Sequence, residues 1–274
     1  MKAVIAIFGV LFILTCVCTI ALAEPIPGAL LYLDARDNPA HDDAWTNLGT
    51  VGGELSGAGK PPVLEEGPIV IPDLGIDTIS KFYTHKKAGQ CWGDQGDNLK
   101  LFLEDWTIDL LIRMNGDSHQ NSPRNQLVGF QPKKLKGENA IRLGFWGDVG
   151  ELVGQFSNVT ATLRPNKGLE EGVWTWMTLV SGDPMKIYHE GRIRNTLPGG
   201  KFKKEPPIEV VIIGANSYGE RDQTFNGSVA LVRIYDRKLK TAEIKQNITA
   251  WTEWRGVDPT SKLSTTWAVI KRGK

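Results

Sequence analysis

The densest group of side chains that could bind a ligand lies in segment 92–98, which has the sequence WGDQGDN. Asp94, Asp97 and Asn98 offer carboxylate and amide oxygens, the ligands that Ca²⁺ prefers. The glycines between them let the backbone fold around an ion. Trp92 adds an aromatic ring that could stack on a sugar. We therefore predict a calcium site at Asp94, Asp97 and Asn98, within a ligand-binding loop that includes Trp92.

Two other segments share this composition. Trp146-Gly147-Asp148 supplies a second aromatic ring and carboxylate, and we predict that Trp146 and Asp148 contact the ligand. Segment 216–226, with the sequence NSYGERDQTFN, is a third candidate. Gly, Asp and Asn also gather in ordinary β-turns, because they tolerate the backbone conformations that turns need. An ordinary turn therefore remains the alternative for all three segments.

The rest of the chain is patterned as a series of short strands. Residues 105–113 alternate, with Ile108, Leu110 and Ile112 on one face. Residues 208–213, apolar except for Glu209, have the pattern of a strand buried on both faces. Further strands are predicted at 30–33, 125–130, 140–145, 151–156, 173–181, 185–189, 192–195 and 229–235. Gly, Asn, Asp and Pro clusters separate them, as in an all-β sandwich or barrel.

One stretch has helical periodicity. From Thr241 to Trp254, the side chains of Ile244, Ile248 and Trp251 recur at the spacing of a single apolar stripe. The sequence therefore predicts one short helix near the C-terminus, packed by this stripe against the strands.

The first 23 residues have the order of a secretory signal: a positive start, an apolar run and Ala21-Leu22-Ala23 at the point of cleavage. The alternative is an uncleaved N-terminal anchor, since the apolar run is long. Either way we expect the protein to be secreted, periplasmic or at the cell surface. We expect residues 24–254 to form one domain, and residues 255–274 a C-terminal tail.

The composition of the chain argues against some classes of partner and of covalent cross-link. Lys plus Arg number 32 and Asp plus Glu number 31, so no excess of positive charge favours a nucleic acid or an anionic membrane as partner. After signal removal Cys91 is the one remaining cysteine, which excludes an internal disulfide. Three sequons begin at Asn158, Asn226 and Asn247, and they are acceptors only in a eukaryotic secretory route.

The order of several segments resembles the laminin-G-like branch of the concanavalin A-like lectin/glucanase superfamily. Trp174 opens a strand, IYHEG at 187–191 follows, GSVALVRIYDRKL at 227–239 closes the series, and AEI at 242–244 begins the helix. DWTID at 105–109 is similar to the family's middle strand. The resemblance covers most of residues 28–254. It implies an all-β, concanavalin A-like jelly-roll β-sandwich of two antiparallel sheets with one short C-terminal helix.

The resemblance also implies a binding function, with a glycan or an extracellular or cell-surface protein as partner. Retaining glucanases of this fold carry Glu-x-Asp-x-x-Glu on one strand, a spacing that is absent from this sequence. The four histidines accompany no nucleophile-elbow motif and no His-x-x-x-His spacing. We therefore expect a non-catalytic module that binds carbohydrate. Ca²⁺ is the expected cofactor. The alternatives are a protein-interaction or cell-adhesion domain and a hydrolase or lyase with an unfamiliar active site.

Overall fold

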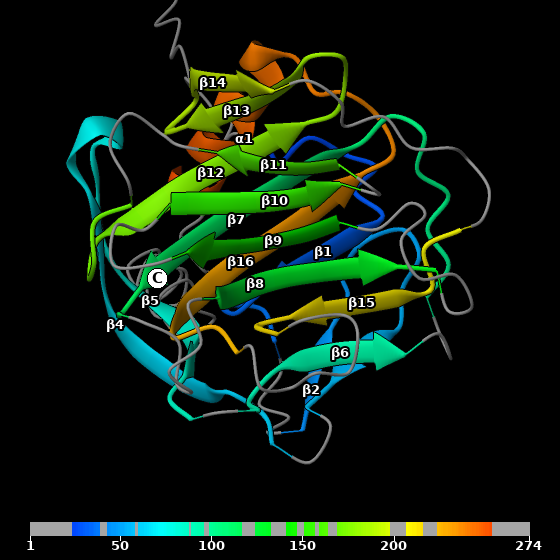
Figure 1. The fold of residues 1–274 in the computed structure, drawn as a ribbon. Helices are drawn as coiled ribbons and strands as arrows, with labels where there is room; N and C mark the ends of the chain where they lie inside the picture. Colours follow the sequence, from blue (N-terminus) through cyan, green and yellow to red (C-terminus); the bar gives the residue numbers. More distant parts are fainter. Residues whose placement is uncertain are drawn as a thin grey trace, which may run out of the picture.

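The protein folds into two facing antiparallel sheets with one helix on the outside (Figure 1). The computed structural model describes residues 24–38, 43–57, 60–87, 89–95, 99–116, 124–132, 141–146, 151–156, 159–163, 169–197, 207–215 and 224–253. The segments predicted to be the signal and the tail therefore lie outside the described residues. Within the described residues, no helix is both long and apolar enough to cross a membrane.

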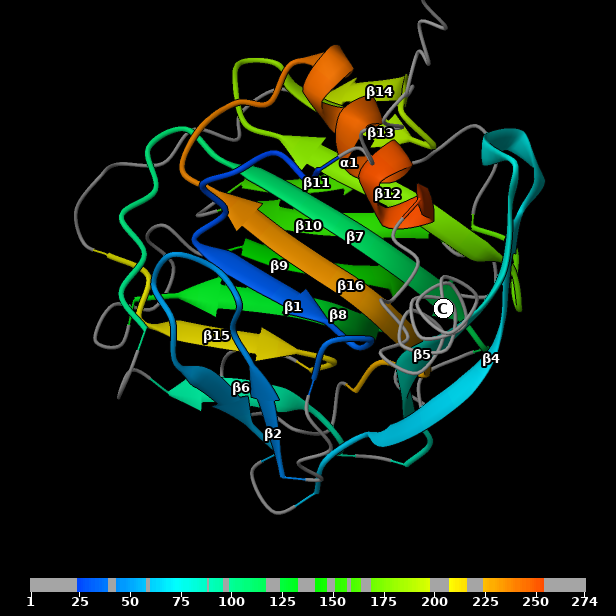
Figure 2. The ribbon, with the colours of Figure 1, turned by 180° about the vertical axis from the view of Figure 1, so that it is seen from behind.

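Sheet A has eight strands in the order β14-β13-β12-β7-β16-β5-β4, with β1 also paired to β16. Their bounds are β1 Leu31–Asp34, β4 Val63–Ile71, β5 Ile76–His85, β7 Thr107–Met114, β12 Trp174–Val180, β13 Met185–His189, β14 Arg192–Leu197 and β16 Gly227–Tyr235. A short 3-10 helix, η1 (Pro72–Leu74), joins β4 to β5. The helix α1 (Thr241–Glu253) lies over the outer face of this sheet (Figure 2).

Sheet B also has eight strands, in the order β11-β10-β9-β8-β15-β6-β3-β2. Their bounds are β2 Ala44–Thr46, β3 Glu54–Ser56, β6 Trp92–Gln95, β8 Arg124–Gln131, β9 Ile141–Trp146, β10 Glu151–Phe156, β11 Val159–Leu163 and β15 Val210–Ile213. The predicted all-β class, two-sheet arrangement and short helix are confirmed. The architecture is consistent with a jelly-roll sandwich.

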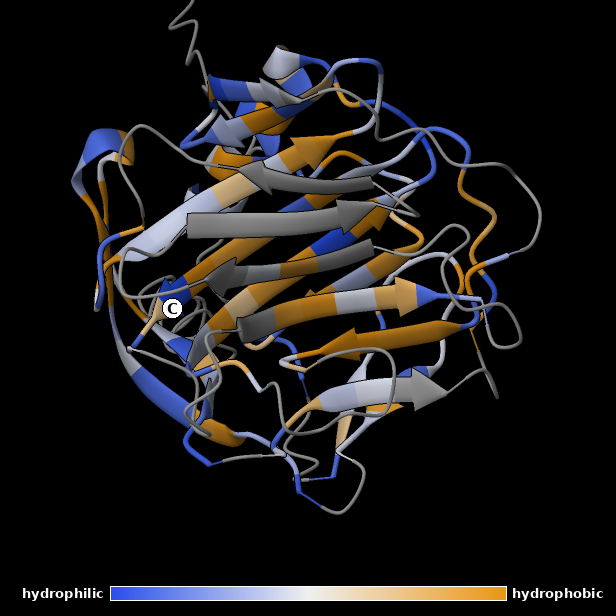
Figure 3. Cartoon of the chain, viewed as in Figure 1, coloured by the Kyte–Doolittle hydropathy of each residue, from blue (hydrophilic) through white to orange (hydrophobic). Residues whose placement is uncertain are grey.

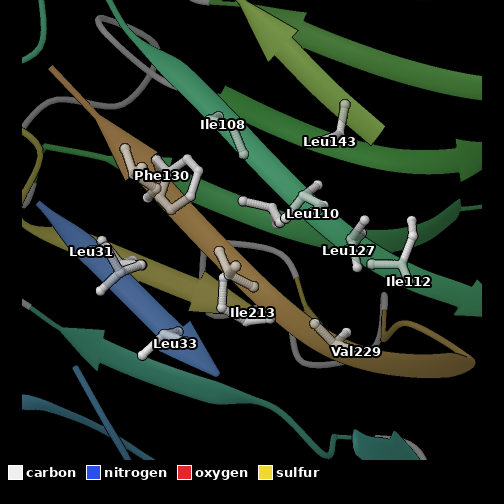
Figure 4. Close-up of a cluster of buried hydrophobic side chains, with 14 of the residues drawn as sticks. Leu31, Leu33, Ile108, Leu110, Ile112, Leu127, Phe130, Leu143, Ile213 and Val229 are labelled. Carbon is white, nitrogen blue, oxygen red and sulfur yellow. The ribbon is translucent and has the colours of Figure 1, made fainter. Parts of the chain in front are cut away.

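The main core fills the space between the sheets. Figure 4 shows aliphatic side chains of β1, β7 and β16 in sheet A facing those of β8, β9 and β15 in sheet B. Ile108, Leu110 and Ile112 enter this core together, as their alternation predicts. The strand β15 is buried on both faces, and Figure 3 shows its hydrophobic character along its length.

The strand β16 separates two apolar clusters. Val232 and Ile234 enter the core between the sheets, while Leu231 and Tyr235 face outward and pack beneath α1. A register shift between Val229 and Leu231 re-phases the strand between its two ends. This two-sided burial explains why the strand has apolar residues at nearly every position.

The hairpin formed by β4 and β5 was not among the predicted elements. Its distal part curls onto the outer face of sheet A, where Ile71, Ile76 and Phe82 join the cluster beneath α1. The Trp174 indole donates a hydrogen bond of 3.1 Å to the Pro68 carbonyl oxygen, which ties β4 to β12. The sequence pattern does not reveal β4, because the strand lies at a sheet edge, carries a proline and buries only two of its nine residues.

The tight hairpin predicted at residues 185–195 is confirmed. Strands β13 and β14 pair in antiparallel register, and Glu190 and Gly191 turn the chain with φ values of 52° and 71°. Gly191 suits that left-handed conformation, whereas Glu190 adopts it against the preference of a residue with a Cβ atom. Gly191 packs closely against α1. A Cβ atom at this position would lie only 3.2 Å from Ile248 Cδ1.

Candidate functional site

The two loops with predicted ligand contacts leave sheet B at opposite ends. Gln95 of β6 and Gln131 of β8 both pair with Val210, so the C-terminal ends of β6 and β8 lie at the same end of the sheet. Strand β9 runs antiparallel to β8 and ends at Trp146, which pairs with Arg124 at the start of β8. The eight residues of β8 span roughly 25 Å. The directions of the three arrows in Figure 1 show this separation.

The predicted residues therefore belong to two separate places. The backbone of Asp94 pairs with Val211 in β6, and Trp146 ends β9. Asp97, Asn98 and Asp148 lie outside the described residues, as do positions 216–223 of the third candidate segment. The calcium site at Asp94, Asp97 and Asn98 and the ligand contacts of Trp146 and Asp148 remain predictions.

Trp92 lies inside the sandwich. Its side chain is fully buried, and its ring centroid lies 5.0 Å from that of Tyr83 and 6.3 Å from that of Trp45. Edge-to-face packing of this kind stabilises a core. Direct contact between Trp92 and a ligand would require the indole to leave that core. The ligand-binding prediction for this loop therefore rests on the residues that follow Trp92.

Trp174 and Trp176 of β12 are buried as well, so neither ring is available on the surface for a sugar. Among the residues that the structure describes, no three His, Cys, Asp or Glu side chains are grouped so that they could hold a metal ion. Three of the polar clusters in the described part of the chain are candidates for chemistry. All three lie on the outer side of sheet A.

The first cluster is a buried ion pair beneath α1. Asp109 of β7 and Arg233 of β16 are directly paired in register, and their side chains are fully buried with 3.6 Å between Oδ2 and Nη1. Asp109 Oδ1 also accepts hydrogen bonds from Trp176 Nε1 at 2.6 Å and Thr178 Oγ1 at 2.7 Å. The carboxylate is therefore held by neutral donors as well as by the cation.

Two further side chains extend this cluster to the helix and to the N-terminal segment. Asn247 of α1 donates to Tyr235 Oη at 3.0 Å and to Asp109 Oδ2 at 3.4 Å. Its Oδ1 accepts the Ile26 N–H at 2.8 Å, and Tyr235 Oη donates to the Ile26 carbonyl oxygen at 3.3 Å. Residues from four distant parts of the chain thus meet beneath α1.

The electrostatics of this cluster indicate a structural role. Burial raises the pKa of Asp109, although Arg233 and the hydrogen bonds act in the opposite direction. Burial also raises the pKa of Tyr235 to about 12. Both groups lie in the closed interior, and neither can meet a substrate there. The cluster orients α1 and the N-terminal segment on sheet A.

The second cluster is a row of polar side chains across one end of sheet A. Arg113 donates to Ser228 Oγ at 3.2 Å, Ser228 bonds to Thr84 at 3.0 Å, and Thr84 donates to Glu65 at 2.5 Å. Lys86 completes the row with an ion pair to Glu65 at 2.5 Å. The row fastens β4 and β5 to β16 and β7.

Aromatic rings hold the end of this row. The Arg113 guanidinium lies 5.1 Å from the Trp174 ring centroid and 5.2 Å from that of Phe82. Both rings are buried, whereas Arg113 is half-buried and Lys86, at the other end of the row, is exposed. Burial opposes ionisation of Glu65, but hydrogen bonds from Lys86 and Thr84 outweigh it and lower the pKa of that carboxyl.

The third cluster is an acidic pair where η1 meets the β13–β14 turn. Burial and the neighbouring Asp73 raise the pKa of Glu190, and the two carboxyls share a hydrogen bond. The Nε2 atom of His189 lies 4.0 Å from Glu190 Oε1, and burial with the nearby Arg194 lowers the pKa of His189. The hydrogen bond between the Asp73 and Glu190 carboxyls joins η1 to the β13–β14 turn.

Sequence patterning missed all three clusters. Their members come from strands that are far apart in the chain, and single charged residues such as Arg113 look like ordinary surface positions. One signal was available. Arg233 stands within an apolar strand that is otherwise buried, and a charge in that setting requires a buried partner.

Comparison with known proteins places these features in a family. A family model described as the concanavalin A-like lectin/glucanases superfamily, of laminin-G type, matches residues 96–245. A search of curated protein sequences finds no match. The matched region includes both strands of the buried ion pair and the first five residues of α1.

Two solved structures illustrate the fold-level similarity. A Trypanosoma rangeli sialidase in complex with sialic acid superposes with a TM-score of 0.55 and 11% identity, covering 83% of this chain and 33% of the sialidase. The botulinum neurotoxin serotype G binding domain gives a TM-score of 0.54 and 9% identity, covering 81% of this chain and 50% of that domain. The chain thus spans about a third of the sialidase and half of the toxin domain.

Proposed function

Because this chain belongs to the concanavalin A-like lectin/glucanases superfamily, we propose that it is a non-catalytic carbohydrate-binding module that works outside the cytoplasm. The family match over more than half of the chain is the observation that carries this proposal. The two-sheet sandwich is the scaffold of a sialidase segment and of a toxin binding domain, which supports a glycan as the ligand class.

The loops at the ends of sheet B are the proposed binding region. Loops carry ligand contacts when a rigid sheet positions them, and both predicted loops leave strands that are anchored in the sheet. We assign Ca²⁺ to the β6 end, through Asp94, Asp97 and Asn98. Trp146 and Asp148 would then serve a separate contact at the other end.

A non-catalytic role is supported by the three polar clusters. The buried pair of Asp109 and Arg233 faces α1, and the row at Arg113 fastens a hairpin. The glucanase carboxylate spacing is also absent from the sequence. Detectable turnover of a polysaccharide, abolished by substitution of a single carboxylate, would contradict this part of the proposal.

A glycan array tests the proposal. The purified chain is applied once with millimolar Ca²⁺ and once with a chelator, and we expect binding that the chelator weakens. Binding that ignores the chelator would support the lectin function but remove the calcium role. Silence in both conditions, with capture by an extracellular matrix protein instead, would favour the protein-interaction alternative.

The calcium assignment has its own control. We expect Ca²⁺ to raise the melting temperature of the chain, because a ligand that binds only the folded state stabilises it. Asp97→Asn should abolish this shift, whereas Asp148→Asn, at the opposite end of sheet B, should preserve it. An unchanged melting temperature at millimolar Ca²⁺ would refute the site at Asp94, Asp97 and Asn98.

The export proposal rests on residues 1–23. Sequencing of the protein recovered from the medium or periplasm should give Glu24 as the first residue. Recovery of the intact chain in a membrane fraction would support the uncleaved anchor instead.

A further inference from the structure

One of the three sequons has its acceptor asparagine buried in the folded chain. Asn247 begins Asn-Ile-Thr, and its side chain is fully buried beneath α1. Its two amide hydrogens are directed to Tyr235 Oη at 3.0 Å and Asp109 Oδ2 at 3.4 Å. Its amide oxygen accepts the Ile26 N–H at 2.8 Å. The amide therefore uses both its donors and its acceptor within the protein.

N-linked glycosylation would alter this same nitrogen. A bond forms between Nδ2 and the anomeric carbon of a sugar, the lipid diphosphate of the donor leaves, and one hydrogen of Nδ2 departs as a proton. One of the two hydrogen bonds from Nδ2 would be lost. A sugar would also have to occupy a closely packed interior, in which no side chain can give way by more than a small shift.

The surroundings of Asn247 make the conflict severe. The Asp109 carboxyl and the Arg233 guanidinium lie in the same buried cluster, and Ile26 of the N-terminal segment closes it from outside. A sugar there would separate α1 from sheet A and expose a buried ion pair.

From these contacts we infer that glycosylation of Asn247 and the native fold are mutually exclusive. The unfolded chain is an acceptor at this sequon, the folded chain is not, and a chain that carries a sugar there cannot complete its fold. Export of the active protein therefore requires a route that leaves Asn247 unmodified. The sequon at Asn226 differs, since that residue is only partly buried at the start of β16.

The chain offers a matched control. Thr249 completes the sequon and lies exposed on α1, so Thr249→Ala removes the acceptor signal while Asn247 keeps its contacts. Alanine is also the better helix former, so the variant should fold at least as well as the natural chain. Its sequons at Asn158 and Asn226 stay intact.

The experiment uses protein purified from a bacterial host without N-glycosylation. A purified single-subunit oligosaccharyltransferase and a lipid-diphosphate oligosaccharide are added to native chain, and to chain diluted directly from urea. Mass spectrometry measures occupancy of Asn247. Modified molecules are isolated on a sugar-binding resin, unfolded and refolded, and their thermal transition is recorded.

We expect Asn247 to be modified in the chain diluted from urea and to remain unmodified in the native chain. Natural-sequence molecules with a sugar on Asn247 should show no cooperative transition, whereas Thr249→Ala molecules modified elsewhere should regain theirs. Occupancy of Asn247 in the native chain would overturn the inference. The inference would also be overturned if Asn247 stayed unmodified in the chain diluted from urea. The same holds if natural-sequence molecules with a sugar on Asn247 melted at the temperature of the unmodified chain.

Discussion

The buried pair of Asp109 and Arg233 gives the most detailed prediction. Asp109→Leu removes the carboxylate and leaves the Arg233 guanidinium fully buried without its anionic partner. At 3.6 Å and an effective dielectric constant of about 20, the lost Coulomb attraction is about 4–5 kcal/mol. Measured losses for one broken partner of a buried pair are about 3–5 kcal/mol. For a domain of this size, that corresponds to a fall in melting temperature of roughly 6–20 °C.

A double variant measures the interaction between Asp109 and Arg233 separately from the contacts that each makes with other residues. Arg233→Met alone should also destabilise, but by less, because Asp109 can take up a proton and keeps its hydrogen bonds to Trp176 and Thr178. Combining Asp109→Leu with Arg233→Met removes both buried charges, so the loss should be smaller than the sum of the single losses by about 2 kcal/mol or more.

Urea unfolding of the three variants at constant pH measures these losses. The midpoint should fall while the denaturant dependence stays constant, since the surface exposed on unfolding changes little. Additive losses in the double variant would refute the reasoning. So would a loss below about 1 kcal/mol for Asp109→Leu, since the pair would then contribute no more than a surface ion pair.

Four other predictions concern the pH dependence of stability, backbone conformation and the core. The lowered pKa of Glu65 means that its contribution is present above the unfolded pKa and is lost as pH falls, so Glu65→Gln should lower the melting temperature at pH 7 but not near pH 3. The pKa of Glu190 is raised, so the pH dependence is reversed: the folded state favours the protonated carboxyl, and this contribution to stability is lost as pH rises. Glu190→Gln should therefore raise the melting temperature more at pH 7 than near pH 4, and equal shifts at the two pH values would contradict this. Gly214→Ala should cost several kcal/mol in urea unfolding, since its Cβ would lie 1.9 Å from a buried imidazole carbon, whereas Gly75→Ala, with open space around it, should cost about 1 kcal/mol from backbone strain alone. Trp92→Ala should cost about 3–5 kcal/mol by the same measurement, and a loss near zero would show that the indole is not part of the core.

The strand pattern was predictable because it depends on local sequence. Residues 105–113 alternate since one face of β7 meets sheet B, and residues 210–213 are apolar throughout since β15 is covered on both faces. The apolar stripe of the helix was predicted to pack against the strands, and Ile244 and Ile248 lie in one cluster with Leu231 of β16. These are consequences of periodicities that a strand or helix imposes on its own residues.

The hairpin of β4 and β5 lay beyond such reasoning. Strand β4 has a proline and only two buried residues, and its place depends on a hydrogen bond from Trp174, more than a hundred residues away. Its curl onto sheet A is a tertiary event, and no local pattern encodes it.

For the candidate site, the sequence determined which residues could bind Ca²⁺ or a sugar, because residue type fixes the chemistry of a side chain. The tertiary structure decided where the strands that precede them end. Strands β6 and β9 end at Gln95 and Trp146, at opposite ends of sheet B, because β8 and β9 run in opposite directions. The tertiary structure also encloses Trp92 in the core, and it turns Asn247 from a sequon into a buried hydrogen-bonding residue. Burial and strand direction are properties of the assembled sheets, and a sequence motif contains neither.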